Sequence, residues 1–541
     1  MPLRDTPHHT QQKPGGGFPR AVGRNSENGR RLDDGFRSDD GLDYAAAHPF
    51  GERGPEDGCR RLLMIAAAFP PTGGPGVQRV AKFAKYLTRF GWLPTVWCMD
   101  RMAQFPEDRT LLSDLPAEVE VLRHTPRRSI SSRFGSLLEP SSWFGTDGTG
   151  KATVFRGVTS AWSRSVPSSC ATSHGDSPDD DDVERWATSS RDALLQLHEA
   201  LGFSAIFSSF SPISNHRVAM MTAERTGLPW VADFRDLWTD DYRYPDSDRA
   251  RFRRDRAEEL RILRAADTVI GVTPQQTRML RDHYDEGSAG FSGGSSTAGH
   301  AEAGATRFLT ITNGFDDEDF GEAWSRPLAR NVRFVMSHIG RLDRRRVSDG
   351  FLRGLAQMAA WLGDRRCRFL FRVVGHCLPS TRELLRRTGI ACEFTGYQPH
   401  GEAIESMRAS DLLLVVVPRG RHADTTIPAK PFEYLATGRP ILLVGPAMGA
   451  CAELVQATES GCVASHNPLD IFRSMRASFV RWERGELVRG CDRSRLSRFR
   501  RVNLASMLAR ELDGICTSAD VVNQSTALLS RAPAGMAKEY R

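Results

Sequence analysis

Short apolar runs alternate with amphipathic segments along most of the chain. Residues 62–68 form a continuous apolar run, the pattern of a parallel strand that is buried on both faces. A turn rich in Gly and Pro follows, and then a helical pattern with Val80, Phe83 and Leu87 on one face and basic residues on the other. Residues 95–99 have the pattern of a second strand. The alternation predicts a strand–loop–helix–strand unit, which is the start of a doubly wound sheet.

The same alternation continues in two regions of the chain that join near residues 313–331. In the first region it predicts helices over 183–201, 216–226 and 250–266 and strands over 205–209, 230–233 and 268–272. In the second region it predicts strands over 334–339, 369–374, 393–395, 412–417 and 441–444 and helices over 349–362, 403–409, 431–436 and 452–456. This pattern predicts an α/β fold with two Rossmann-like, doubly wound parallel-sheet domains. Ligands bind at the carboxyl ends of such strands, so we expect a site in an inter-domain cleft.

Changes in composition suggest where the domains begin and end. We expect an N-terminal domain with two Ser/Gly-rich insertions, a C-terminal domain, a final amphipathic helix and disordered tails that lack hydrophobic periodicity. The expected segments are a tail (1–58), the N-terminal domain (59–325) with insertions near 125–183 and 286–306, the C-terminal domain (326–490), a segment (491–516) with the helix at 493–512, and a second tail (517–541).

The composition excludes several classes of protein. Hydrophobic residues make up 40% of the chain, and no apolar run approaches the roughly 20 residues that span a bilayer, so we expect a globular, water-soluble protein. The ten cysteines form no C-x-x-C pair, and no secretory signal is visible. Reduced thiols predict a cytoplasmic location, at most peripheral at the membrane face. The net charge of +7 comes from dispersed arginines without interleaved aromatic residues, which argues against nucleic-acid binding.

The first candidate for chemistry is the glycine-rich turn between the first strand and the first helix, which contains Gly74 and Gly76. Glycines let backbone N–H groups approach an anion, and the start of a helix adds a favourable dipole. The turn is neither a Walker loop nor a G-x-G-x-x-G fingerprint. We interpret it as a phosphate or substrate loop, with a tight turn that binds no ligand as the alternative.

Two further candidates stand at strand ends in the first region. Asp233, Arg235 and Asp236 either line the cleft or form a structural ion-pair turn. A metal site at the two aspartates lacks supporting ligands. His216 follows the strand at 205–209, where it either acts at the cleft edge or is a packed histidine.

The second region carries a stronger signal. Arg341 and Arg346 belong to a loop with four arginines after a strand, which suits bidentate phosphate contacts unless it is a solvated basic loop. Lys430 and Glu433 stand one turn apart at the start of a predicted helix. A cation for phosphates and a carboxylate for sugar hydroxyls outline a nucleotide-diphosphate site.

Taken in order, five segments resemble the large retaining group of GT-B glycosyltransferases (glycosyl transferases group one). The segments are FPPTGGPGVQR (69–79), LPWVADFRDLW (228–238), NGFD (313–316), GRLDRRR (340–346) and PAKPFEYLATGRPIL (428–442). The resemblance covers about residues 60–515 apart from the two insertions. Each segment alone is a weak signal, but the ordered set is specific, and it implies the GT-B fold.

The resemblance also implies roles for the matching residues. Arg346 and Lys430 would clamp the donor diphosphate, with Arg341 as a second candidate, and Glu433 would bind the donor ribose. His216 matches a first-domain histidine near the reacting sugar.

The match to the family pattern is incomplete in one place. The usual E-x7-E pattern has Thr425 in the position of its first acid. The resemblance therefore implies that backbone groups from Thr425 to Ile427 contact the donor sugar instead. Gly74 and Gly76 would line the donor phosphates and the acceptor.

The implied reaction is transfer of a sugar from a nucleotide-sugar donor with retention of configuration, without a metal or a cofactor. The acceptor would be a saccharide or lipid-linked, in exopolysaccharide, O-antigen or capsule synthesis. Lys82 and Lys85 on the basic first helix would contact anionic lipid at the inner membrane. The helix at 493–512 resembles a C-terminal helix that crosses back to the first domain.

Two alternatives remain open. A nucleotide-sugar epimerase on the same fold would need a richer set of acid and base residues in the cleft. A non-catalytic nucleotide-sugar-binding scaffold is disfavoured by the intact Arg346, Lys430 and Glu433.

Overall fold

The computed structural model describes residues 59–100, 107–125, 154–155, 178–244, 248–289, 305–324, 328–486 and 490–531. The predicted tail at 1–58, most of the insertion at 125–183 and most of the segment at 286–306 lie outside these residues. In the part of the chain that the structure describes, no helix is long and apolar enough to span a membrane.

The first domain is built on a sheet of parallel strands in the order β4-β3-β2-β1-β5-β6-β7-β8. The chain runs outward from β1 to β4 and then returns to place β5 on the other side of β1. In doubly wound sheets, ligands bind at the carboxyl ends of the strands where the order reverses in this way. The elements are β1 (Arg60–Ile65), α1 (Pro75–Leu87), β2 (Trp92–Met99), η1 (Arg109–Leu111), β3 (Glu120–His124), β4 (Val154–Phe155), α2 (Pro178–Leu201), β5 (Ala205–Phe210), α3 (Ser214–Thr226), β6 (Trp230–Phe234), α4 (Arg249–Ala265), β7 (Thr268–Gly271), α5 (Pro274–Ala289) and β8 (Arg307–Thr310).

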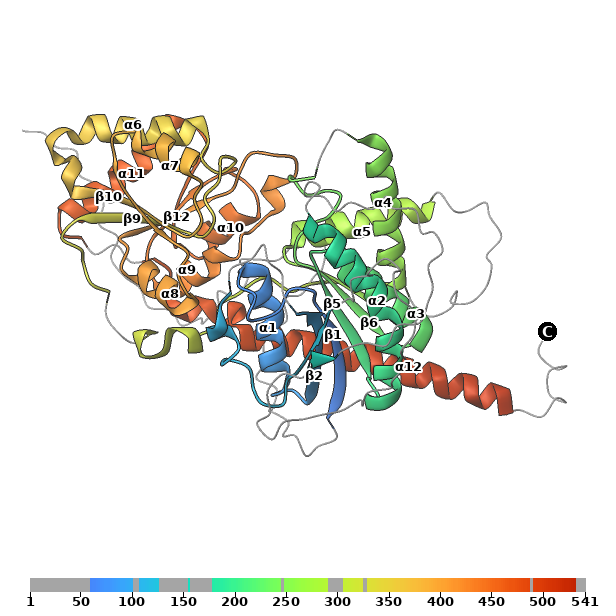
Figure 1. Cartoon of the computed structure of the whole chain (residues 1–541). Helices are drawn as coiled ribbons and strands as arrows, with labels where there is room; N and C mark the ends of the chain where they lie inside the picture. Colours follow the sequence, from blue (N-terminus) through green and yellow to red (C-terminus); the bar gives the residue numbers. More distant parts are fainter. Residues whose placement is uncertain are drawn as a thin grey trace, which may run out of the picture. The chain divides into compact units, whose positions relative to one another are not determined.

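Both faces of this sheet are covered, which explains the unbroken apolar run in β1. Leu63 and Ile65 pack in a core cluster with residues of α2, α3 and α4. Leu62 and Met64 pack in a second cluster, with residues of α1 and of the C-terminal helix. Side chains alternate between the two faces of a strand, so a strand buried on both faces needs apolar residues at every position. Figure 1 shows α1 and α12 next to each other beside β1 and β2.

The second domain is a parallel sheet in the order β11-β10-β9-β12-β13-β14. Helices α6, α7 and α11 cover one face, and α8, α9 and α10 cover the other (Figure 1). The elements are η2 (Glu318–Trp324), β9 (Phe334–Ile339), α6 (Asp349–Leu362), η3 (Gly363–Arg368), β10 (Phe369–Val374), α7 (Pro379–Arg386), β11 (Ala391–Gly396), α8 (His400–Arg408), β12 (Leu412–Val416), η4 (Ala423–Thr425), α9 (Lys430–Thr437), β13 (Ile441–Val444), α10 (Ala450–Ala457), β14 (Gly461–Ala464), α11 (Pro468–Glu483), η5 (Arg493–Phe499) and α12 (Arg501–Arg531).

The chain passes twice between the domains, and the two passages are bonded to each other. Phe315 N donates to Phe499 O at 3.0 Å, and Arg501 N donates to Phe315 O at 2.8 Å. Gly314 allows this close approach, because a Cβ atom there would lie 2.1 Å from Phe499 O. The two sheets belong to one compact unit.

Helix α12 returns to the first domain after the second passage. Leu504, Leu508 and Leu512 recur every fourth residue and pack in one core cluster with Phe83 of α1. Glu511, next to the last of these leucines, accepts a hydrogen bond of 2.6 Å from Thr268 Oγ1 at the start of β7. The helix therefore covers a face of the first sheet that would otherwise be apolar and exposed.

The predicted fold class, two doubly wound parallel α/β sheets, is confirmed. Strands β9, β10 and β13 and helix α6 have the predicted bounds. The C-terminal helix was placed wrongly at both ends. It begins at Arg501 because Asp492 caps a separate 3-10 turn and Arg500 is extended, and it continues to Arg531 through residues that we expected to be disordered. Helices α5, α7 and α11 were missed.

Candidate functional site

The segments singled out in the sequence follow strands at the carboxyl edges of the two sheets. The glycine-rich turn follows β1 and the arginine loop follows β9, while Asp233 lies at the end of β6. Loops at these edges meet, since Thr273 Oγ1 donates to Thr425 O at 2.8 Å and Arg421 Nη2 donates to Thr239 O at 2.9 Å. We call the region where the two carboxyl edges meet the inter-sheet junction.

The glycine-rich turn and Arg235 form one unit at the start of α1. Gly74 caps the helix with a φ of 123°, a backbone conformation that favours glycine. Gly76 lies directly against the Arg235 guanidinium, because a Cβ atom at Gly76 would be 2.4 Å from Arg235 Nη2. Arg235 also donates to Ser211 O at 2.9 Å and lies 3.8 Å from Asp236. This places a cation beside a helix N-terminus, an arrangement that favours an anion.

Asp233 does not face the junction, which corrects the prediction of a cleft carboxylate. Its side chain and that of Arg79 are both 0% exposed and form an ion pair of 2.7 Å. Ser209 Oγ donates to the other carboxylate oxygen at 2.7 Å, and Arg79 also donates to Ile311 O and Thr312 O. The oxygens of Asp233 are thus engaged by internal donors, and the structural alternative applies to this residue.

His216 is also internal, so the prediction that it stands at the cleft edge is not met. Its ring is fully buried and lies 4.6 Å from that of Phe234. Nδ1 hydrogen-bonds Ser208 Oγ at 2.7 Å, and Ser208 accepts a second bond from Trp230. Burial lowers the pKa of His216 to about 3, so the ring is neutral at physiological pH.

The arginine loop after β9 offers two cations at its accessible side. The Arg346 guanidinium donates to Asp343 Oδ2 at 2.8 Å and is partly exposed. The Arg341 side chain is 67% exposed and lies 3.9 Å from the same carboxylate. Arg344, by contrast, pairs with Asp349 of α6. Arg341 and Arg346 therefore share one carboxylate, that of Asp343, between two cations.

Lys430 and Glu433 form a direct pair at the start of α9. Lys430 Nζ donates to Glu433 Oε2 at 2.6 Å, with side chains that are 21% and 7% exposed. Tyr434, the next residue, accepts a hydrogen bond of 2.9 Å from Ile339 N at the end of β9. This bond places the start of α9 and the arginine loop at the same edge of the sheet.

Thr425 and Ile427 are less available to a ligand than expected. The Thr425 hydroxyl and amide both donate to His422 O, and its carbonyl accepts from Thr273. Ile427 is partly buried against the core under α9. The polar groups of Thr425 thus hold its own turn and the contact between domains, while a sugar contact through the Ile427 backbone stays a prediction.

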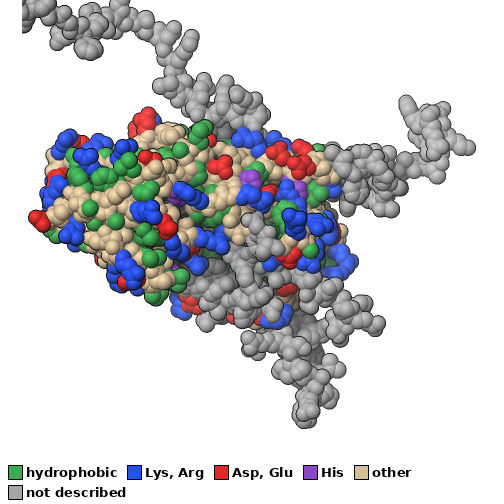
Figure 2. All heavy atoms as spheres, turned by 90° about the horizontal axis from the view of Figure 1, so that it is seen from above, with side chains coloured by type: hydrophobic (Ala, Val, Ile, Leu, Met, Phe, Trp, Pro, Cys, Tyr) green, Lys and Arg blue, Asp and Glu red, His purple; other side chains and the backbone are tan. Residues whose placement is uncertain are grey.

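The lysines of the first helix are not available to a membrane, which removes the basis for the predicted lipid contact. Lys82 and Lys85 are buried, and both ammonium groups bond to Asp114 and Asp316 at 2.6–3.0 Å. Asp114, Asp316 and Glu318 are close enough together for a metal ion, but each of them already forms an ion pair with Lys82 or Lys85. On the face shown in Figure 2, basic and acidic side chains are interspersed.

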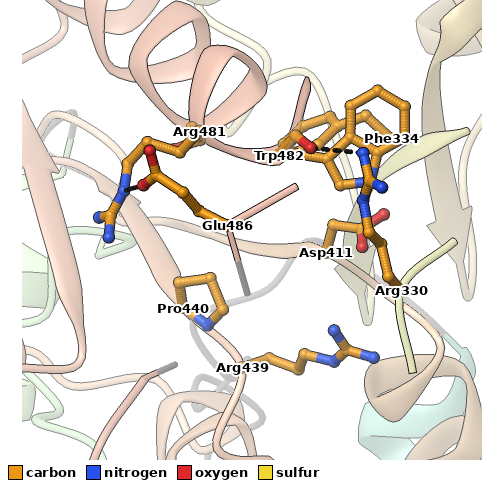
Figure 3. A pocket seen from close by; sticks show the side chains of 9 residues that line it. Arg330, Phe334, Asp411, Arg439, Pro440, Arg481, Trp482 and Glu486 are labelled. Atoms are coloured by element: carbon orange, nitrogen blue, oxygen red, sulfur yellow. Dashed lines mark hydrogen bonds and ion pairs between the residues drawn. The ribbon is translucent and has the colours of Figure 1, made fainter. Parts of the chain in front are cut away.

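A small cavity of about 40 Å³ lies away from the junction, at the amino ends of β9, β12 and β13 (Figure 3). Arg439 at its floor donates to Arg408 O and Ala329 O, and Arg330 donates to Trp482 O while stacking on its ring. These arginines tie backbone segments together. The cavity is a structural feature of the opposite sheet edge.

The chain was compared with known proteins at three levels. No protein-family model and no curated protein matches it. Among solved structures, sucrose-phosphate synthase of Thermosynechococcus elongatus is similar, with a TM-score of 0.50, 14% identity, and coverage of 87% of this chain and 99% of that chain. This chain has the GT-B fold. HepE of Anabaena in complex with UDP and glucose (TM-score 0.44, 15% identity, 86% and 99% covered) and trehalose 6-phosphate synthase of Burkholderia multivorans (0.47, 12%, 86% and 100%) also match.

Three residues that the sequence does not single out position the candidate site: Asn215, Tyr434 and Thr273. Asn215 Oδ1 accepts from Ala67 N at 2.9 Å, and its Nδ2 donates to Ser209 O at 2.7 Å, which ties the segment before the glycine-rich turn to the end of β5. Asn215 directly precedes His216, so the sequence prediction named the right helix start but the neighbouring residue. Tyr434 and Thr273 were overlooked because their partners are distant in the sequence.

Proposed function

We propose that the protein is a glycosyltransferase that moves a sugar from a nucleotide-diphosphate donor to a saccharide or lipid-linked acceptor. The observation that carries the proposal is the Lys430–Glu433 pair at the start of α9, next to the arginine loop. It combines a phosphate-binding cation with a carboxylate for hydroxyl groups at a helix N-terminus. The GT-B fold and the ordered motifs support the same conclusion.

The donor would bind by exchange of ion pairs. Lys430 would leave Glu433 for a diphosphate oxygen, and Glu433 would then accept hydrogen bonds from the ribose hydroxyls. Arg346, and Arg341 with its exposed side chain, would approach the same diphosphate. An anion that binds two or three cations in this way is held by charge-assisted bonds, which are stronger than neutral ones.

On the first domain, the α1 N-terminus with Gly74, Gly76 and Arg235 would face the donor phosphates and the acceptor. Gly76 has no side chain, so Arg235 can lie over the turn. The residues that remain from the predicted first-domain set are therefore the two glycines and Arg235, with Asp236 beside them.

In the reaction, the bond between the anomeric carbon and the diphosphate oxygen breaks, and a bond to the acceptor oxygen forms. The acceptor proton leaves to the departing diphosphate, whose negative charge Lys430, Arg346 and the α9 dipole stabilise. Because these groups supply positive charge, we propose that the reaction needs no metal ion. Retention of configuration is proposed from the family resemblance.

The acids at strand ends give no support to an epimerase. Asp233 is sealed by Arg79, and Asp343 is engaged by Arg346. A reducing, cytoplasmic location is proposed from the ten scattered cysteines of the sequence, which form no C-x-x-C pair. A role in exopolysaccharide, O-antigen or capsule synthesis is proposed from the resemblance alone.

The test is release of nucleoside diphosphate from UDP-, GDP-, ADP- and dTDP-sugars by the full chain, with a pool of saccharide and lipid-linked acceptors. We expect release from one nucleotide class, undiminished by EDTA, and NMR of the product should show the donor's anomeric configuration. A protein that neither binds nor turns over any of these donors would refute the proposal. Loss of activity in EDTA would refute metal independence only.

A further inference from the structure

We propose that Arg501 is a positioning residue that supplies the counter-charge for Glu433 after Lys430 has moved to the donor diphosphate. The inference rests on the proposed function and adds a residue that comes from the C-terminal helix, outside both sheets. Its basis is the packing at the start of α12 and the charges around it.

The start of α12 is held against the start of α9. Arg501 is the first residue of α12, and its backbone N–H donates to Phe315 O at 2.8 Å. Two residues earlier, the ring of Phe499 packs at 5.2 Å from that of Phe432, which directly precedes Glu433. The backbone around Arg501 is therefore fixed beside the helix turn that carries Glu433.

The Arg501 side chain is enclosed there as a charged group. The residue is only 3% exposed, and its Nη1 has no hydrogen-bond partner among the described residues. Burial lowers the pKa of Arg501 to about 10, with Arg79 acting in the same sense, yet the guanidinium remains charged at neutral pH. A buried cation with incomplete hydrogen bonding costs stability unless nearby acids compensate its charge.

Of the acids whose charges act on Arg501, Glu433 is the one that would lose its partner. Glu433, Asp316 and Asp319 all favour the charged guanidinium, Glu433 most strongly. Asp316 and Asp319 are paired with Lys82 at 2.6 and 2.5 Å, and this pairing is internal. Glu433, in contrast, depends on Lys430, the cation that a diphosphate would attract. A nearly buried carboxylate without a counter-charge is strongly disfavoured, and Arg501 would offset that cost.

The test is a double-mutant cycle on binding of nucleoside diphosphates, measured by calorimetry. UDP, GDP, ADP and dTDP are titrated into wild type, Arg501→Met, Glu433→Gln and the double variant, with inorganic pyrophosphate as a probe that lacks ribose. We expect Arg501→Met to weaken binding about tenfold in the wild-type background and less than about twofold in the Glu433→Gln background. Pyrophosphate also draws Lys430 away from Glu433, so its binding should weaken in Arg501→Met by a similar factor.

Two further variants separate positioning from simple structural support. Arg501→Lys retains the charge and should restore most of the affinity, whereas Arg510→Met on the same helix, whose Nε bonds within its own helix, should leave binding unchanged. The melting temperature of Arg501→Met should equal or exceed that of wild type, because removal of a poorly satisfied buried charge is neutral or stabilising. If Arg501→Met does not fold, Arg501→Gln takes its place in the cycle.

The outcomes distinguish this inference from the proposed function. Equal losses in both backgrounds, or an unchanged affinity for pyrophosphate, would mean that Arg501 does not act through the Glu433 charge that Lys430 leaves, and would overturn the inference alone. The inference would also fail if wild type bound a diphosphate that Arg501→Met bound equally well. If wild type binds none of the four diphosphates, the proposed function fails and this inference fails with it.

Discussion

Each domain carries a cation–carboxylate pair at a carboxyl edge, and the two pairs differ in access to solvent. Arg79 and Asp233 in the first domain are 0% exposed and share further bonds with backbone and hydroxyl groups. Lys430 and Glu433 in the second domain are partly accessible, with one bond of 2.6 Å between them. Under the proposed function the same two charge types serve different purposes, since the second pair would exchange its partner for a ligand and the first pair would not.

The difference teaches how to choose between a structural and a functional interpretation of a charged motif. A buried ion pair repays its desolvation only when its geometry is complete, and this completeness leaves no bonding capacity for a substrate. In the Lys430–Glu433 pair the lysine side chain is 21% exposed, so its ammonium group loses less on separation and can turn to an approaching anion. Four predictions follow from the contrast, the first with the largest expected effect.

Removal of the acid from the buried Arg79–Asp233 pair, called the sealed pair below, should strongly destabilise the protein. Asp233→Ala leaves the Arg79 guanidinium buried and unpaired, and the expected loss is about 3–5 kcal/mol of unfolding free energy. Urea denaturation followed by circular dichroism measures it. Asp236→Ala is the matched control, since Asp236 lies three residues on, is partly exposed and pairs with Arg243 at 3.0 Å. It should cost about 1 kcal/mol or less, and equal losses in the two variants would abolish the distinction between sealed and open pairs.

Removal of the cation from the Lys430–Glu433 pair, the open pair, should strongly reduce turnover while leaving the fold intact. We expect Lys430→Ala to lower kcat/KM for the donor by about 10²–10³, because one preorganised charge at the departing diphosphate is lost. The measurement is nucleoside diphosphate release by the purified variant. Arg387→Ala removes an exposed cation of the same domain that pairs with Glu383 one helical turn away, and it should keep wild-type activity. Wild-type release by Lys430→Ala would show that the site lies elsewhere.

The sequence predicted that Lys430 and Glu433 stand one helical turn apart, but it did not predict that Arg79 and Asp233 meet, and the reason is separation along the chain. Lys430 and Glu433 are three residues apart, so helical spacing alone brings them together. Arg79 and Asp233 are 154 residues apart, and only the assembled sheet joins them. Most strands could be predicted because a parallel strand buried on both faces is a continuous apolar run, as in β1 and β9.

His216 shows a second limit of the sequence prediction. Asn215 and His216 are both buried, yet Asn215 bonds to the backbone before the glycine-rich turn while His216 lies among aromatic rings. Successive helix residues point about 100° apart, so which of the two reaches that turn depends on the rotation of α3 over the sheet, and local sequence does not determine that rotation. The end of α12 was missed for a related reason, since the leucine repeat that predicts the helix stops at Leu512 while the helix continues.

The buried state of His216 should be visible in the pH dependence of stability. Its pKa is lowered from 6.5 to about 3 by burial, so the unfolded chain binds the proton first. Stability is therefore complete above pH 6.5 and is lost as pH falls from 6.5 toward 3, at up to roughly 1.4 kcal/mol per pH unit. His216→Gln should flatten this part of the profile, measured by chemical denaturation between pH 7 and 4.5. An unchanged slope in His216→Gln would contradict the buried assignment.

The smallest expected effect concerns Arg235, the cation beside the glycine-rich turn of the first domain. Asp233 and Arg235 are two residues apart, yet Asp233 is sealed while the Arg235 guanidinium lies over the glycine-rich turn, against Gly76. Gly76→Ala would put a methyl group 2.4 Å from Arg235 Nη2, and because this is the tip of a flexible side chain, it should move aside at little cost to stability. The displaced guanidinium would no longer reinforce the α1 N-terminus, so donor affinity should fall by about two- to fivefold, as for one partly exposed ionic contact.

Gly401→Ala in α8, where a Cβ atom meets nothing within 4 Å, is the control and should bind as wild type does. Unchanged affinity in Gly76→Ala would mean that Arg235 belongs with the structural charges, and the exchangeable charges of this protein would then all lie on the second domain.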